Sequence, residues 1–429
     1  MKLLVVSPDY SSHALPMIEV GKAWAAKHGG AVVATGQATR PLVEAAGLTW
    51  VELRLGKGSN GGVIEAEKQP VGEDDHLRAF FDATRAGPVT TLRYQANARL
   101  HDLLHEPDRV LDRLMEIMVE VQPDRVVVDH VAFGARVALH ALGVQPATMV
   151  LGHPSALSAP GEVYGLPPTW PTALQPDAVD LDDLAARCHA SVRELATTAN
   201  DVLTRRAADR LPLGDLTSAG GQPTIYVYPE ALHDRGRPLP DHHVFIGSLA
   251  RTEHLGDVAL PTGPGPRVTV ALGSFLSARS DVLAVAARAA QLGGWRLALA
   301  YGSSSLDDIG PLPIGALVAR HLPQVALLAH TDVFIHHGGN GSVTEAATAG
   351  VPTVVLPFST DQFAGAVAIE RTSLGIALAP NALTPEQLVD AVTEVLTNGA
   401  AERAKELARS IASAGGAAAA AAAIAAIAT

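Results

Sequence analysis

A glycine-rich stretch in the second half of the chain has the residue types needed to hold a phosphate group. It runs His336-His337-Gly338-Gly339-Asn340-Gly341-Ser342, after an apolar run that ends at Ile335 and before a helix predicted to begin near Ser342. Glycines let backbone N–H groups approach an anion closely, and the dipole of the following helix favours negative charge. Ser342 can cap the helix or donate to a phosphate, and the His337 imidazole can donate an N–H to the same group. Glu345, one turn along, can accept from ribose hydroxyls.

Three other interpretations of this stretch are open. A strand, a glycine turn and a helix often follow one another without any ligand. The two adjacent histidines can form a metal pair, but neighbouring residues leaving a strand point to opposite faces, and no carboxylate or third histidine is close in the sequence. Gly339, Gly341 and Asp361 partly match a dinucleotide-binding fingerprint, although Thr344 stands at the third glycine position and Asp361 lies beyond the end of the next predicted strand.

A histidine and an aspartate in the first half suit a general base and its partner. His13 lies a few residues after the first predicted strand, and Asp129 ends another. Both follow carboxyl ends of strands, so one rim of a parallel sheet can bring them within hydrogen-bond reach. An imidazole suits proton abstraction at neutral pH, and a carboxylate behind it fixes its tautomer and stabilises the imidazolium. Taken alone, His13 also fits a solvated loop and Asp129 a helix cap, and His130 is the rival for the second position.

Alternating strand-like and helix-like segments position these residues. This alternation predicts parallel sheets with helices on both faces, and uniformly apolar runs such as Val126–Val128 fit a sheet that is covered on both sides. Strands are predicted at Lys2–Ser7, Ala31–Thr35, Trp50–Leu53, Arg125–Asp129, Ala147–Leu151, Val202–Thr204, Ile225–Tyr228, Arg267–Leu272, Trp295–Tyr301, Val333–Ile335, Thr353–Leu356 and Ile376–Leu378.

The run Pro261-Thr262-Gly263-Pro264-Gly265-Pro266 cannot continue a helix or a central strand, and it marks the join between two halves. We therefore predict an α/β fold with two doubly wound domains, residues 1–246 and 267–399, joined by a linker at 247–266 and followed by a helical tail at 400–429. The expected ligand site is the cleft between the domains. Two irregular segments, 56–86 and 151–176, contain Phe80, Phe81 and Trp170. A pocket for an apolar acceptor and ordinary surface loops are both open for them.

With these motifs the chain resembles the inverting, nucleotide-sugar-dependent glycosyltransferases of the GT-B fold, especially the bacterial enzymes that decorate natural products. The resemblance covers the whole layout, two Rossmann-like domains facing across a cleft, and is most specific from His321 to Gln362. It implies that Gln324 contacts the nucleobase, His337 the diphosphate, and Glu345 the ribose. The full set of donor-binding residues that it implies is Ser274, His321, Leu322, Gln324, His337, Gly339, Asn340, Gly341, Ser342, Glu345, Asp361 and Gln362.

Within this set, Asp361 and Gln362 match the pair that hydrogen-bonds sugar hydroxyls in the family. Ser274 matches the family's first donor-domain loop, and an ordinary tight turn is the alternative for it. Plant members stack a tryptophan on the base where this chain has His321, so both thymidine and uridine donors are open. Relatives that transfer deoxysugars favour the former.

The resemblance further implies that His13 is the base, that Asp129 is its partner, and that attack opposite the diphosphate inverts the anomeric centre. The glycine cradle would then replace a metal ion, and no cofactor is expected beyond the nucleotide-sugar co-substrate. Asp180-Leu181-Asp182 fits the Asp-x-Asp motif of metal-dependent transferases, but it opens a predicted helix, where acidic residues favour the dipole.

The composition narrows the partners of the chain. With 429 residues and a net charge of -12, it is large enough for two domains and unsuited to a nucleic-acid backbone. The single cysteine, Cys188, excludes a disulfide framework. We expect a cytoplasmic enzyme without a membrane span that takes a small apolar acceptor, and a homodimer is open. The Ala-rich tail is expected either to pack back on the first domain or to be partly disordered. A GT-B epimerase or hydrolase, a non-catalytic partner of another transferase, and a dehydrogenase are the alternative functions.

Overall fold

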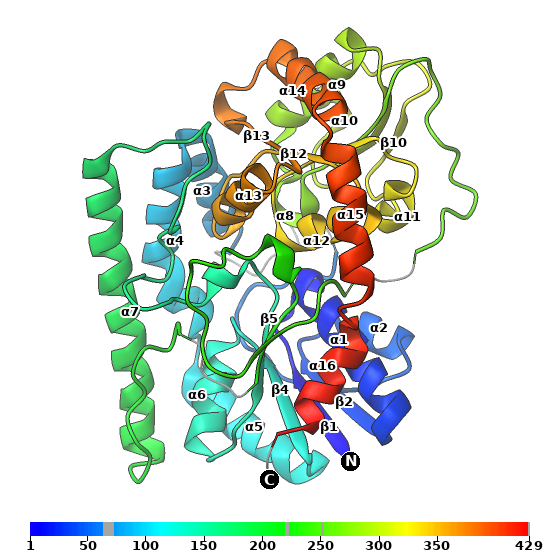
Figure 1. The fold of residues 1–429 in the computed structure, drawn as a ribbon. Coiled ribbons are helices and arrows are strands. Elements are labelled where there is room, and N and C mark those ends of the chain that lie inside the picture. The colour runs from blue at the N-terminus through cyan, green and yellow to red at the C-terminus, as the bar shows by residue number, and fades with distance from the viewer. Residues whose placement is uncertain (63–72, 219–222, 250–252, 428–429) are drawn as a thin grey trace.

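Two parallel sheets organise the protein, as seen in a computed structural model that describes all residues except 63–72, 219–222, 250–252 and 428–429 (Figure 1). The first sheet has seven strands in the order β3-β2-β1-β4-β5-β6-β7, and the second has six in the order β10-β9-β8-β11-β12-β13. The strands within each sheet pair in parallel, and helices cover both faces. The predicted α/β class with two doubly wound halves is confirmed.

The first half forms around short, buried strands. The middle strands β1 and β4 are apolar and almost fully buried, because helices cover them from both sides. In chain order its elements are β1 (Lys2–Val6), α1 (Ser11–His28), β2 (Gly30–Thr35), α2 (Arg40–Ala45), β3 (Thr49–Glu52), α3 (Glu73–Ala86), α4 (Pro88–Leu103), α5 (Pro107–Val121), β4 (Arg125–Asp129), α6 (Phe133–Ala141), β5 (Ala147–Val150), η2 (Pro154–Ala156), α7 (Ala178–Arg206), β6 (Thr224–Tyr226), η3 (Glu230–Leu232) and β7 (His243–Phe245).

The second half repeats this plan around β8 and β11, which are also buried. Its elements are β8 (Arg267–Ala271), α8 (Gly273–Leu276), α9 (Ser280–Leu292), β9 (Arg296–Ala300), α10 (Leu306–Ile309), β10 (Leu317–Ala319), α11 (Gln324–Leu328), β11 (Val333–His336), α12 (Asn340–Ala349), β12 (Thr353–Val355), α13 (Gln362–Arg371), β13 (Gly375–Ala377), η4 (Pro380–Ala382), α14 (Pro385–Thr397), α15 (Ala400–Ala412) and α16 (Gly416–Ala425). The predicted domain boundaries stay a prediction, and part of the proposed linker lies outside the described residues.

Some of the predicted elements were wrong. The β-branched run Val202–Thr204 lies inside the helix α7, whose apolar face packs on α4 and α6. The segment 56–86 is not irregular throughout, since α3 begins at Glu73. Two short edge strands, β7 and β10, were missed.

The helices α3, α4 and α7 form a layer on one side of the molecule that reaches from the first half to the second (Figure 1). Leu77 and Phe81 of α3 belong to the core of the second half. The amide of Asn381, in the second half, donates to the carbonyl oxygens of Thr84 (2.8 Å) and Arg85 (3.0 Å). The two halves are therefore joined by a helical layer as well as by the chain between them.

The C-terminal helices return to the first half. The helix α15 packs on α12, and α16 packs on α1, where Ala420, Ala421 and Ile424 are buried in the core of the first half. Of the two arrangements expected for the tail, the structure thus has the one in which the tail packs back on the first half. The stretch Ala400–Ala425, which contains α15 and α16, is long and apolar enough (mean hydropathy 1.3) to cross a membrane. One such stretch is weak evidence for a membrane span. Burial of α16 against α1 accounts for its apolar face.

Candidate active site

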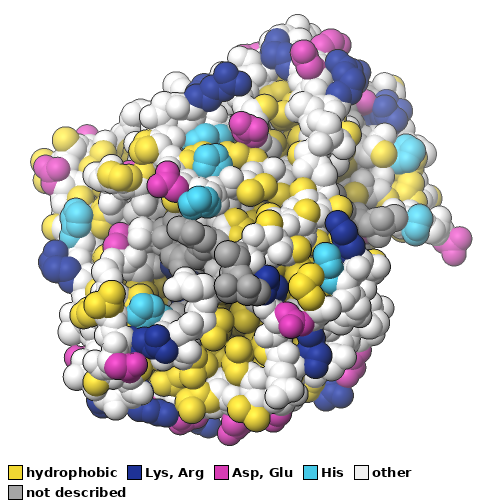
Figure 2. All heavy atoms as spheres, turned by 60° about the horizontal axis from the view of Figure 1, so that its bottom comes forward, with side chains coloured by type: hydrophobic (Ala, Val, Ile, Leu, Met, Phe, Trp, Pro, Cys, Tyr) yellow, Lys and Arg dark blue, Asp and Glu magenta, His cyan; other side chains and the backbone are white. Residues whose placement is uncertain are grey.

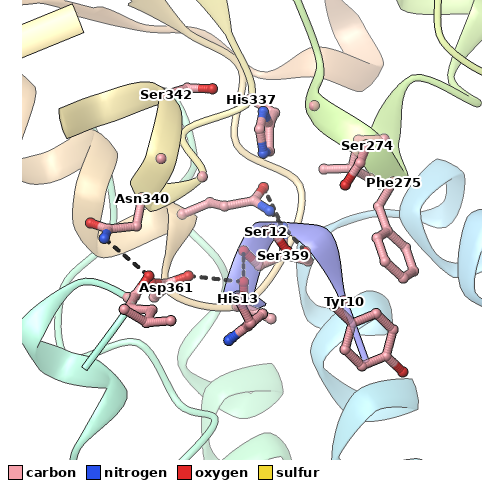
Figure 3. A pocket seen from close by; sticks show the side chains of 18 of the residues that line it. Tyr10, Ser12, His13, Ser274, Phe275, His337, Asn340, Ser342, Ser359 and Asp361 are labelled. Atoms are coloured by element: carbon pink, nitrogen blue, oxygen red, sulfur yellow. Dashed lines mark hydrogen bonds between the residues drawn. The ribbon is translucent and has the colours of Figure 1, made fainter. Parts of the chain in front are cut away.

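A cavity of about 880 Å³ lies between the two halves. Residues at the carboxyl ends of β1, β4 and β5 line it from one side, and residues following β8 and β11 line it from the other. In Figure 3, His13 of the first half and His337 of the second face the same space from opposite sides. The cleft therefore brings together the two predicted chemical centres.

The predicted base and its partner meet on the first-half wall. The Nδ1 atom of His13, in the first turn of α1, lies 2.7 Å from Oδ2 of Asp129 at the end of β4. Asp129 is fully buried, whereas a quarter of the His13 side chain is exposed. The other carboxylate oxygen of Asp129, Oδ1, accepts a hydrogen bond from the backbone N–H of Val131 (3.0 Å). This carboxylate is fixed, so it can hold the imidazole in one orientation.

Charge couples the two residues. Burial acts to lower the pKa of His13, but the charge and hydrogen bond of Asp129, and then the charge of Asp361, outweigh it and raise that pKa above its ordinary value. For Asp129, burial acts to raise the pKa, but the charge and hydrogen bond of His13, followed by the contact with His130, lower it well below its usual range. The aspartate is ionised at neutral pH and stabilises an imidazolium at His13.

The opposite wall presents the start of α12. This helix begins at Asn340, two residues earlier than predicted, with Gly339 in the cap position and no side-chain cap. Ser342 therefore lies inside the first turn and does not cap the helix. The first intrahelical backbone donor is Val343, so the N–H groups of the three preceding residues lie before the helical hydrogen-bond ladder. This helix start, which lines the cavity, has the donors and the dipole that an anion requires.

The ring of His337 lies between two glycines beside this helix start. A methyl group on Gly273 would lie 2.6 Å from Cε1 of His337, and one on Gly339 would clash with Nε2. Burial lowers the pKa of His337 to about 4, so the ring is neutral at pH 7. Its Nδ1 atom is buried without a hydrogen-bond partner among the described residues. A neutral imidazole of this kind can donate one N–H to a ligand.

Two further predicted donor residues contact each other. Nε2 of Gln324 donates to Oε2 of Glu345 over 2.6 Å. Ser274, His321 and Leu322 line the same cavity. The structure thus gathers these residues from three separate segments around the same cavity.

Three predicted donor residues are held by other protein groups. The amide of Asn340 donates to the carbonyl oxygens of Leu151 (3.0 Å) and Val227 (2.9 Å) in the first half. Oδ2 of Asp361 accepts the backbone N–H of His153 over 2.6 Å, also across the cleft. Oε1 of Gln362 accepts two backbone N–H groups of its own loop. Asn340 and Asp361 therefore connect the two halves.

Of the predicted acceptor residues, only Phe80 lines the cavity. Phe81 points into the core of the second half, and Trp170 packs on Phe363 of α13, with ring centroids 4.7 Å apart. Neither of these two lines the cavity, because Phe81 of α3 and Trp170 of the loop before α7 both pack against the second half instead. The cavity is also lined by residues that sequence reasoning missed, among them Tyr10, Tyr94, Arg99, Tyr164 and Phe275. They come from four separate segments, with Tyr94 and Arg99 both on α4, and no local pattern marked them.

The first residue of the Asp-x-Asp pattern, Asp180, belongs to a surface ion-pair group together with Asp183. Asp180 and Asp183 pair with Arg93 at 2.8 and 2.7 Å, and this group joins α7 to α4. Within the described part of the chain, three or more histidine, cysteine or acidic side chains do not converge as a metal site would require.

Comparisons with known proteins agree with this geometry. Residues 295–426 match the family model described as Erythromycin biosynthesis protein CIII-like, C-terminal domain. Demethyllactenocin mycarosyltransferase of Streptomyces fradiae is 30% identical over 234 residues, which are 54% of this chain and 48% of that enzyme. The 3-alpha-mycarosylerythronolide B desosaminyl transferase of Saccharopolyspora erythraea is 26% identical over 93% of this chain and 91% of that enzyme.

A solved structure is similar over almost the whole chain. The calicheamicin glycosyltransferase CalG4 superposes with a TM-score of 0.70, covering 98% of this chain and 96% of that one at 20% identity. A structural similarity at 20% sequence identity shows that the fold is shared, and it shows the fold alone.

Proposed function

We propose that this chain, which has the GT-B fold and is similar to bacterial enzymes of natural-product biosynthesis, is a glycosyltransferase that inverts the anomeric centre of a nucleoside diphosphate sugar. The proposed reaction moves a hexose or deoxyhexose to a hydroxyl of a small, largely apolar acceptor. The observation that carries the proposal is the pairing of His13 with buried Asp129, across the cleft from the start of α12.

The proposed proton transfer uses His13. With Nδ1–H donated to Asp129, the Nε2 lone pair of His13 takes the proton of the acceptor hydroxyl. The hydroxyl oxygen forms a bond to the anomeric carbon as the bond from that carbon to the diphosphate breaks. The proton stays on the imidazole, and Asp129 stabilises the resulting cation.

The leaving diphosphate needs stabilisation of its growing negative charge. The backbone N–H groups at the start of α12 and the neutral ring of His337 are suited to supply it. Preorganised donors of this kind support a reaction without a metal ion, which is part of the proposal. Glu345 and Gln324 would hold the nucleoside at the same end of the cleft.

The donor is proposed to be a thymidine or uridine diphosphate sugar. The two curated relatives are named for mycarosyl and desosaminyl transfer, which supports a deoxysugar and, with it, thymidine. As part of the same proposal the enzyme acts in the cytoplasm.

A test that does not require the acceptor is thermal stabilisation by nucleoside diphosphates. We expect TDP or UDP to raise the melting temperature more than the corresponding monophosphates do, because the diphosphate contacts α12. The matched control is Gly341→Ala, which should lose this stabilisation, because a methyl group there meets open space within the protein and would obstruct only a close ligand. A diphosphate that stabilises neither the wild-type enzyme nor the variant argues against the proposed donor site.

Metal independence has its own test, transfer in the presence of excess EDTA. We expect the rate to be unchanged, and strict dependence on Mg²⁺ or Mn²⁺ would contradict the proposed role of the helix start.

A further inference from the structure

His130, which follows the catalytic-pair residue Asp129 directly, is held rigidly at the carboxyl end of β4. Its backbone N–H donates to the carbonyl oxygen of Met149 over 2.9 Å. Its own carbonyl oxygen accepts from Nη1 of Arg136, a buried guanidinium, over 3.1 Å. The residue is 4% exposed, and that small exposed part belongs to the wall of the cavity. Its position is therefore fixed independently of any ligand.

One nitrogen of the His130 ring is used by the protein. The backbone N–H of Leu151 donates to Nδ1 over 3.4 Å, and Nδ1 also lies 3.1 Å from Oδ1 of Asp129. Both contacts meet at Nδ1, so Nε2 is the ring nitrogen that is left to bind a ligand, and no described residue supplies a hydrogen bond to it.

Asp129 thus carries two imidazoles, one on each oxygen. His13 is on Oδ2 and His130 on Oδ1, with ring centroids 6.3 Å apart and ring planes inclined by 29°. In both rings Nδ1 is turned to the carboxylate, and both rings line the same cavity. The cavity wall therefore presents two neighbouring imidazoles, and the second of them is not needed for proton removal.

We propose that His130 determines acceptor specificity through a hydrogen bond between its Nε2 atom and a second hydroxyl, close to the hydroxyl that His13 deprotonates. This rests on the proposed function. The favoured acceptors are small apolar molecules with two hydroxyls on neighbouring or alternate carbons. His130 orients such a molecule so that one particular hydroxyl reaches His13. The pair is not symmetric, because a quarter of the His13 side chain is accessible but only 5% of the His130 side chain.

The His130→Asn variant separates this role from a purely structural one. An asparagine amide can keep the contacts with Asp129 and with the N–H of Leu151, but it places no atom where Nε2 of histidine lies. The probes are 2,3-dihydroxynaphthalene and 2-naphthol, which share one skeleton and differ by one hydroxyl. Their binding to the TDP-saturated enzyme is measured by titrating naphthol fluorescence.

We expect the wild-type enzyme to bind the diol about threefold to tenfold more tightly than 2-naphthol, the range for one neutral hydrogen bond. In His130→Asn the two affinities become equal through loss of diol binding alone. The control Phe80→Leu, which trims an apolar wall of the same cavity, weakens both probes alike.

Three results would overturn the inference: an unchanged preference in His130→Asn, an equal loss of both probes, or a wild-type enzyme that prefers neither. The proposed function is tested by separate experiments, namely thermal stabilisation by TDP or UDP and loss of sugar transfer in His13→Ala. An enzyme that transfers sugar through His13 but shows no such preference would refute only the role of His130.

Discussion

The 2.7 Å contact between His13 and Asp129 can be tested by the change Asp129→Asn. Asparagine has nearly the same volume, so the fully buried site keeps its packing but loses the negative charge. The amide can also donate to Nδ1 of His13, which would leave Nε2 protonated and unable to act as a base. Because a positioned general base contributes about 100- to 10,000-fold, we expect kcat/KM to fall by about that factor, or roughly 3–5 kcal/mol of barrier.

The pH profile makes this prediction more specific. The pKa of His13 is raised because Asp129 outweighs burial, and only neutral His13 can act as the base. Activity of the wild-type enzyme should therefore rise with pH through that raised pKa. Without the carboxylate, burial is the main remaining influence, so the rising limb should move to lower pH while the plateau falls.

The assay is kcat/KM for product formation between about pH 5 and 9, with TDP affinity as a control for the intact donor site. In the double variant with His13→Ala, Asp129→Asn should add little, since the two residues act as a unit. A full wild-type plateau in Asp129→Asn, or a rising limb displaced to higher pH, would refute this reasoning.

Three further predictions concern the same site. His337→Ala should weaken binding of TDP about tenfold by calorimetry while binding of the naphthol probes stays nearly unchanged, and the reverse order would remove His337 from the donor site. Gly273→Ala should lower the melting temperature, because φ is +74° and the methyl group would lie 2.6 Å from Cε1 of His337; an unaltered melting temperature would contradict this packing. His13→Asn should cost stability in urea most below about pH 6.5, the ordinary histidine pKa, and progressively less as pH rises through the raised pKa of His13; a cost that grows with pH would contradict the ion pair.

The sequence was informative where local patterns and fold rules coincide. The strands β1, β4, β8 and β11 are mostly apolar, and the rule that ligands bind at carboxyl ends placed His13 and Asp129 on one rim. Tertiary packing decided the rest. Val202–Thr204 has strand propensity, but α7 buries one face of a 29-residue helix, and that burial outweighs local preference.

The residues that join the two halves were the hardest to predict. Phe81 and Trp170 are apolar and belong to segments that were predicted to line the cleft, yet they pack between the halves. The presence of an aromatic residue in a segment does not say which way its side chain points. The hydrogen bonds from the Asn340 amide to the carbonyl oxygens of Leu151 and Val227, directly after β5 and β6, likewise depend on how the halves meet. A single sequence contains no local signal for such contacts.

The return of α16 to the first half has a consequence for biosynthesis. Trp24 on α1 shares its core with Ile424, Gly416 donates to the carbonyl of Ile246, and Arg125 donates to the carbonyl of Ile427. The ribosome makes α16 only after the rest of the second half, so the nascent N-terminal half lacks part of its own interior until α16 has been synthesised. A truncation before α16 would leave that apolar surface uncovered and the newly made chain exposed to aggregation and proteolysis.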